Sequence, residues 1–214
     1  ENVKFADHWL APHPGTDAAV AQAMTHVILQ EYYENQPNDM FINYAKQYSD
    51  MPFVIMLDED ENGYKAGRFL RASDLGMSGE NNEWKPVIQD KLSQQLLVPN
   101  GTMGQRWEEG KKWNLKLETE DGTPIDPMLS MVESDYHVET IQFPYFDSSG
   151  DGIFERPIAT RTIQLANGEE VKIATVYDLM TSQYGVQRFE HELEATSYDD
   201  ASSKYTPAWQ EQIT

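Results

Sequence analysis

The chain has 214 residues, no cysteine and a formal net charge of -20, with 36 acidic residues against 16 Lys and Arg. Its length allows one sizeable hydrophobic core or two small ones, and the lack of cysteine excludes disulfides, thiolate nucleophiles and cysteine-ligated zinc or iron–sulfur clusters from this chain. The acidic balance excludes a nucleic-acid partner, and no apolar run reaches the roughly 18 residues that a membrane span needs.

The first predicted helix follows the bend at Pro14-Gly15. Thr16 or Asp17 can cap its N-terminus, and Pro37 ends it. Apolar residues recur at three- and four-residue spacing, which predicts a stripe that faces a core. This stripe consists of Val20, Ala23, Met24, Val27 and Ile28, with Glu31 at the same spacing. A second helix is predicted from a cap at Asp39, with one face made of Phe41, Tyr44, Ala45 and Tyr48.

Two β-hairpins are predicted farther along the chain. The first joins "PFVIML" to "YKAGRFLR" through "DEDENG", where Asn62-Gly63 supplies the positive φ angles of a tight turn. The second joins "RTIQL" to "EVKIATV" around Asn167-Gly168. It is followed by "YDLMTSQYG", a short helix that ends at Gly185.

Residues 72–110 are rich in Gly, Asn and Pro, so we expect loops with short elements, pinned by Trp84, Trp107 and Trp113. The fold class expected from all these elements is α/β, or mixed α+β for the chain by itself. Helices come first, and hairpins with long irregular loops follow.

Two loops resemble half of a calcium-binding loop. Residues 58–63 ("DEDENG") and 147–152 ("DSSGDG") have oxygen ligands and glycine at suitable spacing. The twelfth position, where a glutamate normally closes the site, is Phe69 in one and Ile158 in the other. We therefore interpret both as turns and predict no metal ligands. A noncatalytic acidic module that binds calcium or a partner stays open as an alternative.

The bend at Gly15 offers a different chemistry. The free N–H groups of a first helical turn present partial positive charge, which suits a phosphate even on an acidic protein. The carboxylate of Asp17 can accept two parallel N–H bonds, which a guanine edge offers. From the residues alone, an ordinary capped helix and a nucleotide contact both remain possible readings of Gly15, Thr16 and Asp17.

Several segments agree, in order and spacing, with one family. They are "WLAPHPGTDAAVAQAMTHVILQEYY", "YSDMPFVIMLDEDENGYKAGRFLRASDL", "VPNGTMGQRWEEGKKWNLKLE", "FPYFD", "VYDLMTSQYGVQR" and "ATSYDDASSKYTPAWQEQIT". Together they resemble the middle of the catalytic (alpha) subunit of respiratory membrane-associated nitrate reductase. That subunit is a molybdopterin oxidoreductase of the dimethyl sulfoxide reductase type. "PGTDAA" is widespread in the superfamily, whereas "GRFLRASDL", "KWNL" and "YTPAWQEQIT" are typical of the nitrate reductase branch.

The resemblance implies an internal portion of an enzyme that reduces nitrate to nitrite in anaerobic respiration. The intact subunit would hold molybdenum bis(molybdopterin guanine dinucleotide), and Gly15, Thr16 and Asp17 would contact one guanine dinucleotide. Its iron–sulfur cluster and its catalytic residues would lie outside this chain. The implied division is 1–57 as the helical portion of a guanine-dinucleotide-binding α/β domain, 58–205 as a mixed insertion and 206–214 as the start of a truncated helix.

The resemblance also implies partners. These are the rest of the catalytic subunit, an iron–sulfur (beta) subunit and a membrane cytochrome (gamma) subunit. The expected location is the cytoplasmic face of a membrane, reached through those partners, with this chain itself soluble. A related oxidoreductase acting on perchlorate, chlorate, selenate or a hydrocarbon is the alternative within the superfamily.

Overall fold

The computed structural model describes residues 4, 6–144, 153–192, 194 and 197–198. Its longer helices are α1 (Asp17–Ile28), the π-helix η2 (Leu29–Asn35), α2 (Asp39–Tyr48) and α3 (Val176–Gln183). Its 3-10 helices are η3 (Ala72–Leu75), η4 (Asn82–Trp84), η5 (Met103–Trp107) and η6 (Met131–Glu133). Its strands are β1 (Val54–Asp60), β2 (Gly63–Phe69), β3 (Ile88–Gln89), β4 (Leu96–Leu97), β5 (His137–Pro144), β6 (Ile153–Gln164) and β7 (Glu170–Thr175). The predicted mixed α+β class is confirmed.

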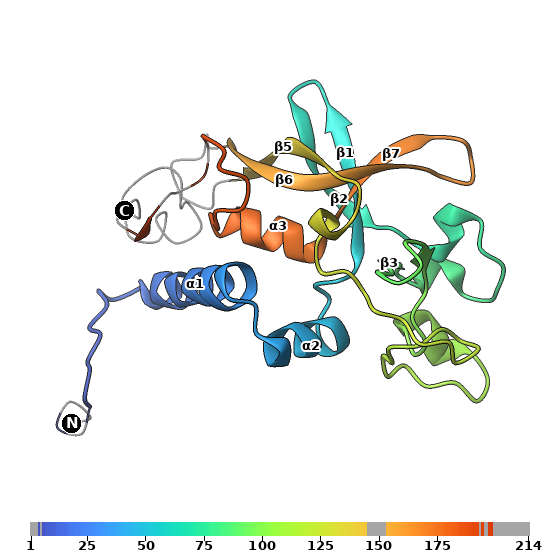
Figure 1. Cartoon of the computed structure of the whole chain (residues 1–214), viewed down its shortest axis with the longest axis horizontal. Helices are drawn as coiled ribbons and strands as arrows, with labels where there is room; N and C mark the ends of the chain where they lie inside the picture. The colour runs from blue at the N-terminus through green and yellow to red at the C-terminus, as the bar shows by residue number, and fades with distance from the viewer. Residues whose placement is uncertain (1–3, 5, 145–152, 193, 195–196, 199–214) are drawn as a thin grey trace.

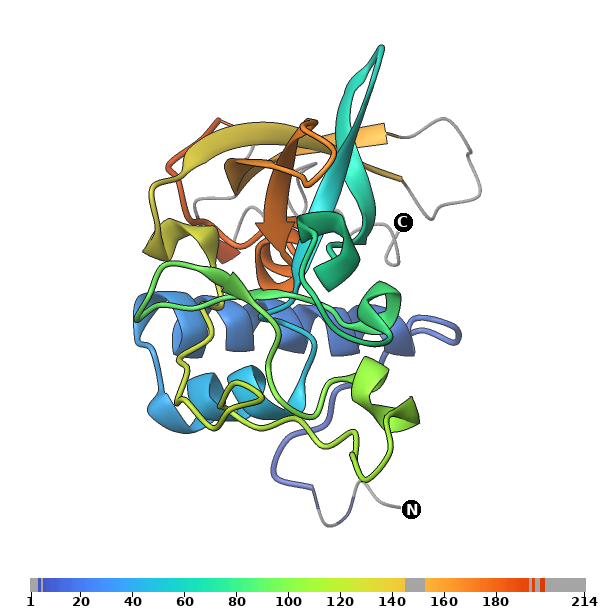
Figure 2. The same ribbon diagram turned by 90° about the vertical axis from the view of Figure 1, so that its right-hand side faces the viewer.

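A closed barrel in the order β1-β2-β5-β6-β7 forms the body of the fold, and β3 and β4 make a separate two-stranded sheet (Figures 1 and 2). Only β2 and β5 pair in parallel, through Tyr64 with Ile141 and Lys65 with Gln142. Alternate residues of each strand point into the barrel, so apolar side chains from opposite strands meet there. Two core clusters result on the two faces of the strands: Val54 and Ile173 belong to one, and Ile141 and Ile158 to the other.

The helices pack on one side of this barrel. Figure 1 shows α3 between the barrel and α1, and α1 continues without a break into η2. The ring Nδ1 of His26 lies 2.6 Å from the carbonyl oxygen of Tyr184, just after α3. The Gln30 amide oxygen accepts the N–H of Gln187 at 3.0 Å. A third core cluster fills this junction, so one face of α1 and η2 is fixed against α3: it contains Leu29, Ala45, Leu129, Tyr177 and Val186.

A buried ion pair joins these layers. Arg188 Nη1 donates to Asp178 Oδ1 at 2.7 Å, and both side chains are almost wholly enclosed. Although burial opposes it, the negative charges of Asp178 and Glu34 raise the pKa of Arg188. Asp178 also accepts the Ser130 hydroxyl at 2.6 Å and the N–H of Met131 at 2.9 Å. Because its lone pairs are satisfied by several donors, this carboxylate is stable without water.

Both predicted hairpins are confirmed. β1 and β2 turn at Gly63, whose φ is 124°, and β6 and β7 turn at Gly168, whose φ is 87°. The positive φ also expected at Asn62 is wrong, because only Gly63 of that pair has one. The short helix also forms, as α3, and Gly185 follows it with φ 72°. Residues 72–110 are irregular as expected, with 3-10 helices and the short strands β3 and β4. The pairing of β5 with the first half of β6 was not predicted.

The predicted core stripe of the first helix is wrong in part. Met24, Val27 and Ile28 are exposed, because the helix packs through the neighbouring face that contains His26 and Leu29. The face of α2 differs in the same way. Ala45 is buried, whereas Tyr44 and Tyr48 are exposed and pack on each other with ring centroids 5.1 Å apart.

Two smaller expectations are also corrected. The cap of α2 is Asn38, whose side chain accepts the N–H of Met40 at 3.0 Å, and not Asp39. The three loop tryptophans are all exposed, so they do not anchor the loops in a core. Trp84 and Trp107 nevertheless pack on each other, with ring centroids 5.7 Å apart, and connect η4 with η5.

Loss of the buried cation should be costly. Arg188→Ala leaves Asp178 charged and enclosed, so we expect the free energy of unfolding to fall by about 3–5 kcal/mol. Lys91→Ala breaks a largely exposed pair with Glu133 and should cost less than about 1 kcal/mol. Urea denaturation followed by circular dichroism measures both. Equal losses in the two variants would contradict a structural role for the buried pair.

His26 should make stability depend on pH. Burial lowers its pKa below the usual value of 6.5, although the bond to the Tyr184 carbonyl opposes this. The unfolded chain therefore binds a proton more readily than the folded chain, and stability is lost as the pH falls below about 6.5. Each pKa unit of lowering is worth about 1.4 kcal/mol. His26→Gln should remove this part of the slope in unfolding experiments between about pH 7.5 and pH 5, and an unchanged slope would refute it.

Candidate functional site

The three residues proposed as a site from sequence lie together at the start of α1, on a tight turn that we call the Gly15 corner (His13–Asp17). The N–H of Thr16 donates to the carbonyl of His13 at 3.0 Å, which closes a four-residue β-turn. Pro14 and Gly15 are its central residues, and Gly15 has φ 90°. This is the type II pattern, in which glycine is required at the second central position. The sequence "HPGT" therefore determines the direction in which α1 begins.

No side chain caps this helix end. The expected cap by Thr16 is wrong, because its hydroxyl donates backward to the carbonyl of His13 at 2.8 Å. Asp17 is the first residue of α1 and its side chain is exposed. Apart from Gly15 itself and its two chain neighbours, no residue has an atom within 4 Å of the position that a Cβ on Gly15 would occupy. Within the described residues the corner is therefore open, and it combines the backbone N–H groups of a first helical turn with the exposed carboxylate of Asp17.

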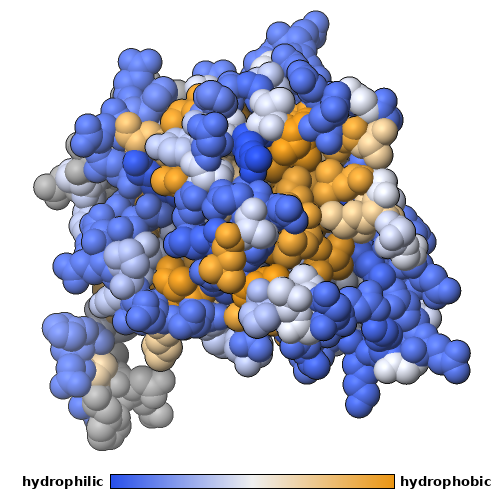
Figure 3. Space-filling view, turned by 45° about the vertical axis from the view of Figure 1, so that its right-hand side comes forward, coloured by the Kyte–Doolittle hydropathy of each residue, from blue (hydrophilic) through white to orange (hydrophobic). Residues whose placement is uncertain are grey.

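A second concave feature lies between the two hairpins, and we call it the hairpin cleft. β1 and β7 pair only from Val54 to Met56 and from Ile173 to Thr175, and beyond those pairs the hairpins diverge. The cleft between them has a volume of about 860 Å³. Met56 and Leu57 form its apolar floor, together with half-buried side chains such as Val171. Figure 3, which brings the hairpin side forward, shows an apolar area bordered by hydrophilic side chains.

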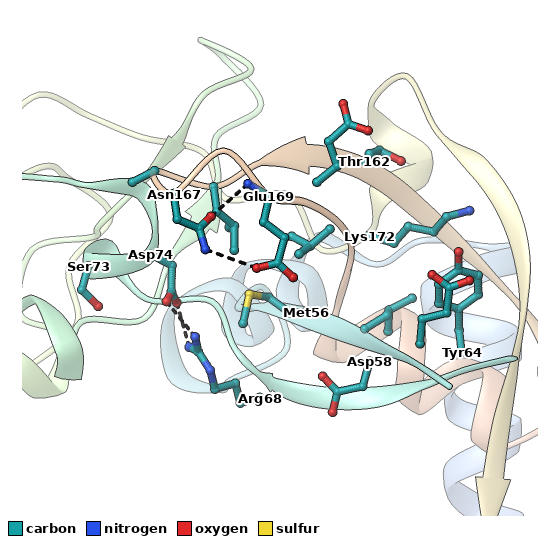
Figure 4. A pocket seen from close by; sticks show the side chains of 16 residues that line it. Met56, Asp58, Tyr64, Arg68, Ser73, Asp74, Thr162, Asn167, Glu169 and Lys172 are labelled. Carbon is teal, nitrogen blue, oxygen red and sulfur yellow. Dashed lines mark hydrogen bonds and ion pairs between the residues drawn. The ribbon is translucent and has the colours of Figure 1, made fainter. Parts of the chain in front are cut away.

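Several polar side chains that line the hairpin cleft make ion pairs or hydrogen bonds (Figure 4). Arg68 donates to both carboxylate oxygens of Asp74 at 2.7 Å, and this ion pair lowers the pKa of Asp74, although burial opposes the shift. On the other side Asn167 donates to Glu169 at 3.2 Å. Lys172 pairs with Glu139. Arg68 thus connects β2 with η3 and Lys172 connects β7 with β5, and none of these contacts combines a nucleophile with a base.

The calcium-like loops have different outcomes. Residues 58–63 form the end of β1 and its turn, where Asp60 accepts the N–H of Asn62 at 2.8 Å and pairs with Lys65 at 2.9 Å. The prediction of a turn is confirmed there. Residues 147–152 lie outside the described residues. In the part of the chain that the structure describes, His, Asp and Glu side chains form no group of three or more suited to a metal ion. Nor is any described helix long and apolar enough to span a bilayer.

Known proteins provide an independent comparison. No protein-family model matches the chain. Over its whole length the chain is 46% identical to the nitrate reductase alpha chain of Bacillus subtilis and 41% identical to the respiratory nitrate reductase 1 alpha chain of Escherichia coli. The chain belongs to the nitrate reductase alpha-chain family. It spans only 17% and 18% of the length of those two relatives.

Similarity extends more weakly beyond this family. The perchlorate reductase alpha subunit of Dechloromonas aromatica is 23% identical over 83% of the chain. The Gly15 corner, the hairpins and the barrel therefore belong to one segment of a nitrate reductase alpha chain. Within that segment the Gly15 corner is the only sequence-predicted site, and the structure adds no catalytic residue to it among the described residues.

Sequence reasoning overlooked the buried polar network between α3 and η2. Arg188, Asp178 and Ser130 were not singled out, because isolated charged residues in an acidic chain look like surface residues. One local signal was present, since Thr175 and Asp178 form the capping-box pattern of Thr followed three residues later by an acid. That signal locates the start of α3, but not the long-range contact with Arg188.

The different caps of α1 and α3 lead to a matched test. Thr175 accepts the N–H of Asp178 at 3.0 Å and donates to the carbonyl of Leu129 at 2.6 Å, so Thr175→Val should cost about 2 kcal/mol. Thr16→Val removes no cap and should cost less than about 0.5 kcal/mol. Thermal unfolding of both variants measures the difference. A large loss at Thr16 would show that the first turn of α1 is capped after all.

Proposed function

We propose that this chain is the part of a nitrate reductase alpha chain that holds one guanine dinucleotide arm of the molybdenum cofactor. The open helix end at the Gly15 corner is the observation that supports this function. The proposed contact residues are Gly15, Thr16 and Asp17. In this proposal residues 1–57 belong to the cofactor-binding domain, 58–205 to a mixed insertion, and 206–214 to the start of a further helix.

The residues of the corner suit this ligand. The φ of 90° at Gly15 and the empty space around its Cα allow a bulky group to approach the backbone. The N–H groups of the first helical turn would bind the pyrophosphate, since they have no side-chain partner at Thr16. The exposed carboxylate of Asp17 would accept the ring N–H and the amine of guanine as two parallel bonds. The local positive potential of the helix end offsets the acidity of the whole chain.

In the intact enzyme we propose reduction of nitrate to nitrite and water, with two electrons and two protons consumed. The molybdenum cofactor, when bound, supplies the oxygen-transfer chemistry. This chain supplies binding and orientation through its corner. Identities of 46% with a nitrate reductase and 23% with a perchlorate reductase favour nitrate as the substrate. An iron–sulfur subunit and a membrane cytochrome subunit would be the partners, and they would place the enzyme at the cytoplasmic face of the membrane.

The test is Asp17→Ala in the intact alpha chain. Loss of the guanine contact should lower the cofactor content severalfold, while helix stability changes by no more than about 1 kcal/mol. Molybdenum is measured by mass spectrometry of the metal, and guanine nucleotide by chromatography after acid release. Asp39→Ala is the matched control, because Asp39 is also an acid in a first helical turn. Full cofactor content in the Asp17 variant would refute the proposed contact.

A further inference from the structure

The side of α1 and η2 that faces away from α3 carries exposed apolar residues, which we call the uncovered stripe: Met24, Val27, Ile28 and Tyr32. Their exposed fractions are 53%, 40%, 43% and 47%. Their spacing of three and four residues places them in one row along the helix. Isolated apolar residues on a surface are ordinary, but a row of this length indicates an interface.

The opposite face of the same helix is already packed. Leu29 is 2% exposed and His26 5%, and both contact the region of α3. An ordinary surface helix has one apolar face and one polar face. A helix with apolar residues on both faces is typical of a position between two layers of structure. In the described residues only one of those layers is present.

We propose that the uncovered stripe is the contact surface for another part of the same alpha chain, outside these 214 residues. The relatives are about six times longer, since the chain spans only 17–18% of them, so ample polypeptide is available to form the second layer. A second copy of this chain is disfavoured, because each copy has a formal charge of -20 and the two would repel.

The residues of the uncovered stripe also indicate the chemistry of the surface that packs against it. Met24, Val27 and Ile28 are wholly apolar and Tyr32 is largely so, while Glu31 borders the row and its carboxylate accepts the Tyr198 hydroxyl at 2.6 Å. The covering surface is therefore apolar, as on one face of a helix or sheet. Contact there would hold α1 from both sides and so fix the direction of the Gly15 corner. The inference itself depends only on the exposed row, not on the proposed cofactor contact.

Methionine oxidation in the intact alpha chain tests the burial of this stripe. Hydrogen peroxide converts accessible methionine to the sulfoxide, and peptide mass spectrometry reads each position separately. We expect Met24 to react at least about tenfold more slowly in the folded than in the urea-unfolded alpha chain. Met128 and Met131, which are 0% exposed here, give the rate of a buried methionine. If Met24 reacts as fast in the folded as in the unfolded alpha chain, the proposal is overturned.

Photo-crosslinking identifies what covers the stripe. A benzoylphenylalanine introduced in place of Val27 in the intact alpha chain should form a bond within the same polypeptide, to a peptide outside these 214 residues. A bond to a second alpha chain or to another subunit, or no bond at all, overturns the proposal. The molybdenum content of the same preparations is recorded separately, so failure of the cofactor contact and failure of this interface remain distinguishable.

Discussion

The structure depends on one enclosed ion pair, between Arg188 and Asp178. Removing both charges from water is costly, and the cost is offset only because the donors of Ser130 and Met131 also reach the carboxylate. Arg188 Nε lies 3.0 Å from a carboxylate oxygen of Glu34 in η2, so the same guanidinium reaches the helical layer. The start of η6, α3 and η2 are thereby held in one arrangement by a few atoms.

That arrangement fixes the orientation of α1, at whose N-terminus the Gly15 corner lies. Packing of His26 and Gln30 against the residues after α3 orients α1, while the type II turn at Gly15 starts the helix in the open. The rigid layer is thus separate from the exposed end that would meet a ligand. Binding sites on helix ends benefit from this separation, because the donors are held in place before the ligand arrives.

Local patterns in the sequence predicted local structure well. The turns at Gly63 and Gly168 were recognised because glycine alone tolerates their φ angles. The stripe of α1 was assigned to the wrong face because apolar residues occur on both sides of that helix. Periodicity alone does not show which of the two sides packs against α3. The Gly15 corner was found from its turn, whereas its lack of a cap depended on how the Thr16 hydroxyl rotates, which no sequence pattern encodes.

The early divergence of β1 from β7 has an evolutionary consequence. Past Ile173, β7 pairs only with β6 among the described strands, so residues added at the tip around Gly168 would leave the pairing of the other strands unchanged. The match with the Escherichia coli relative extends over 228 positions for 214 residues of this chain. Projecting hairpins of this kind allow homologous proteins to differ in surface loops while they keep the same core.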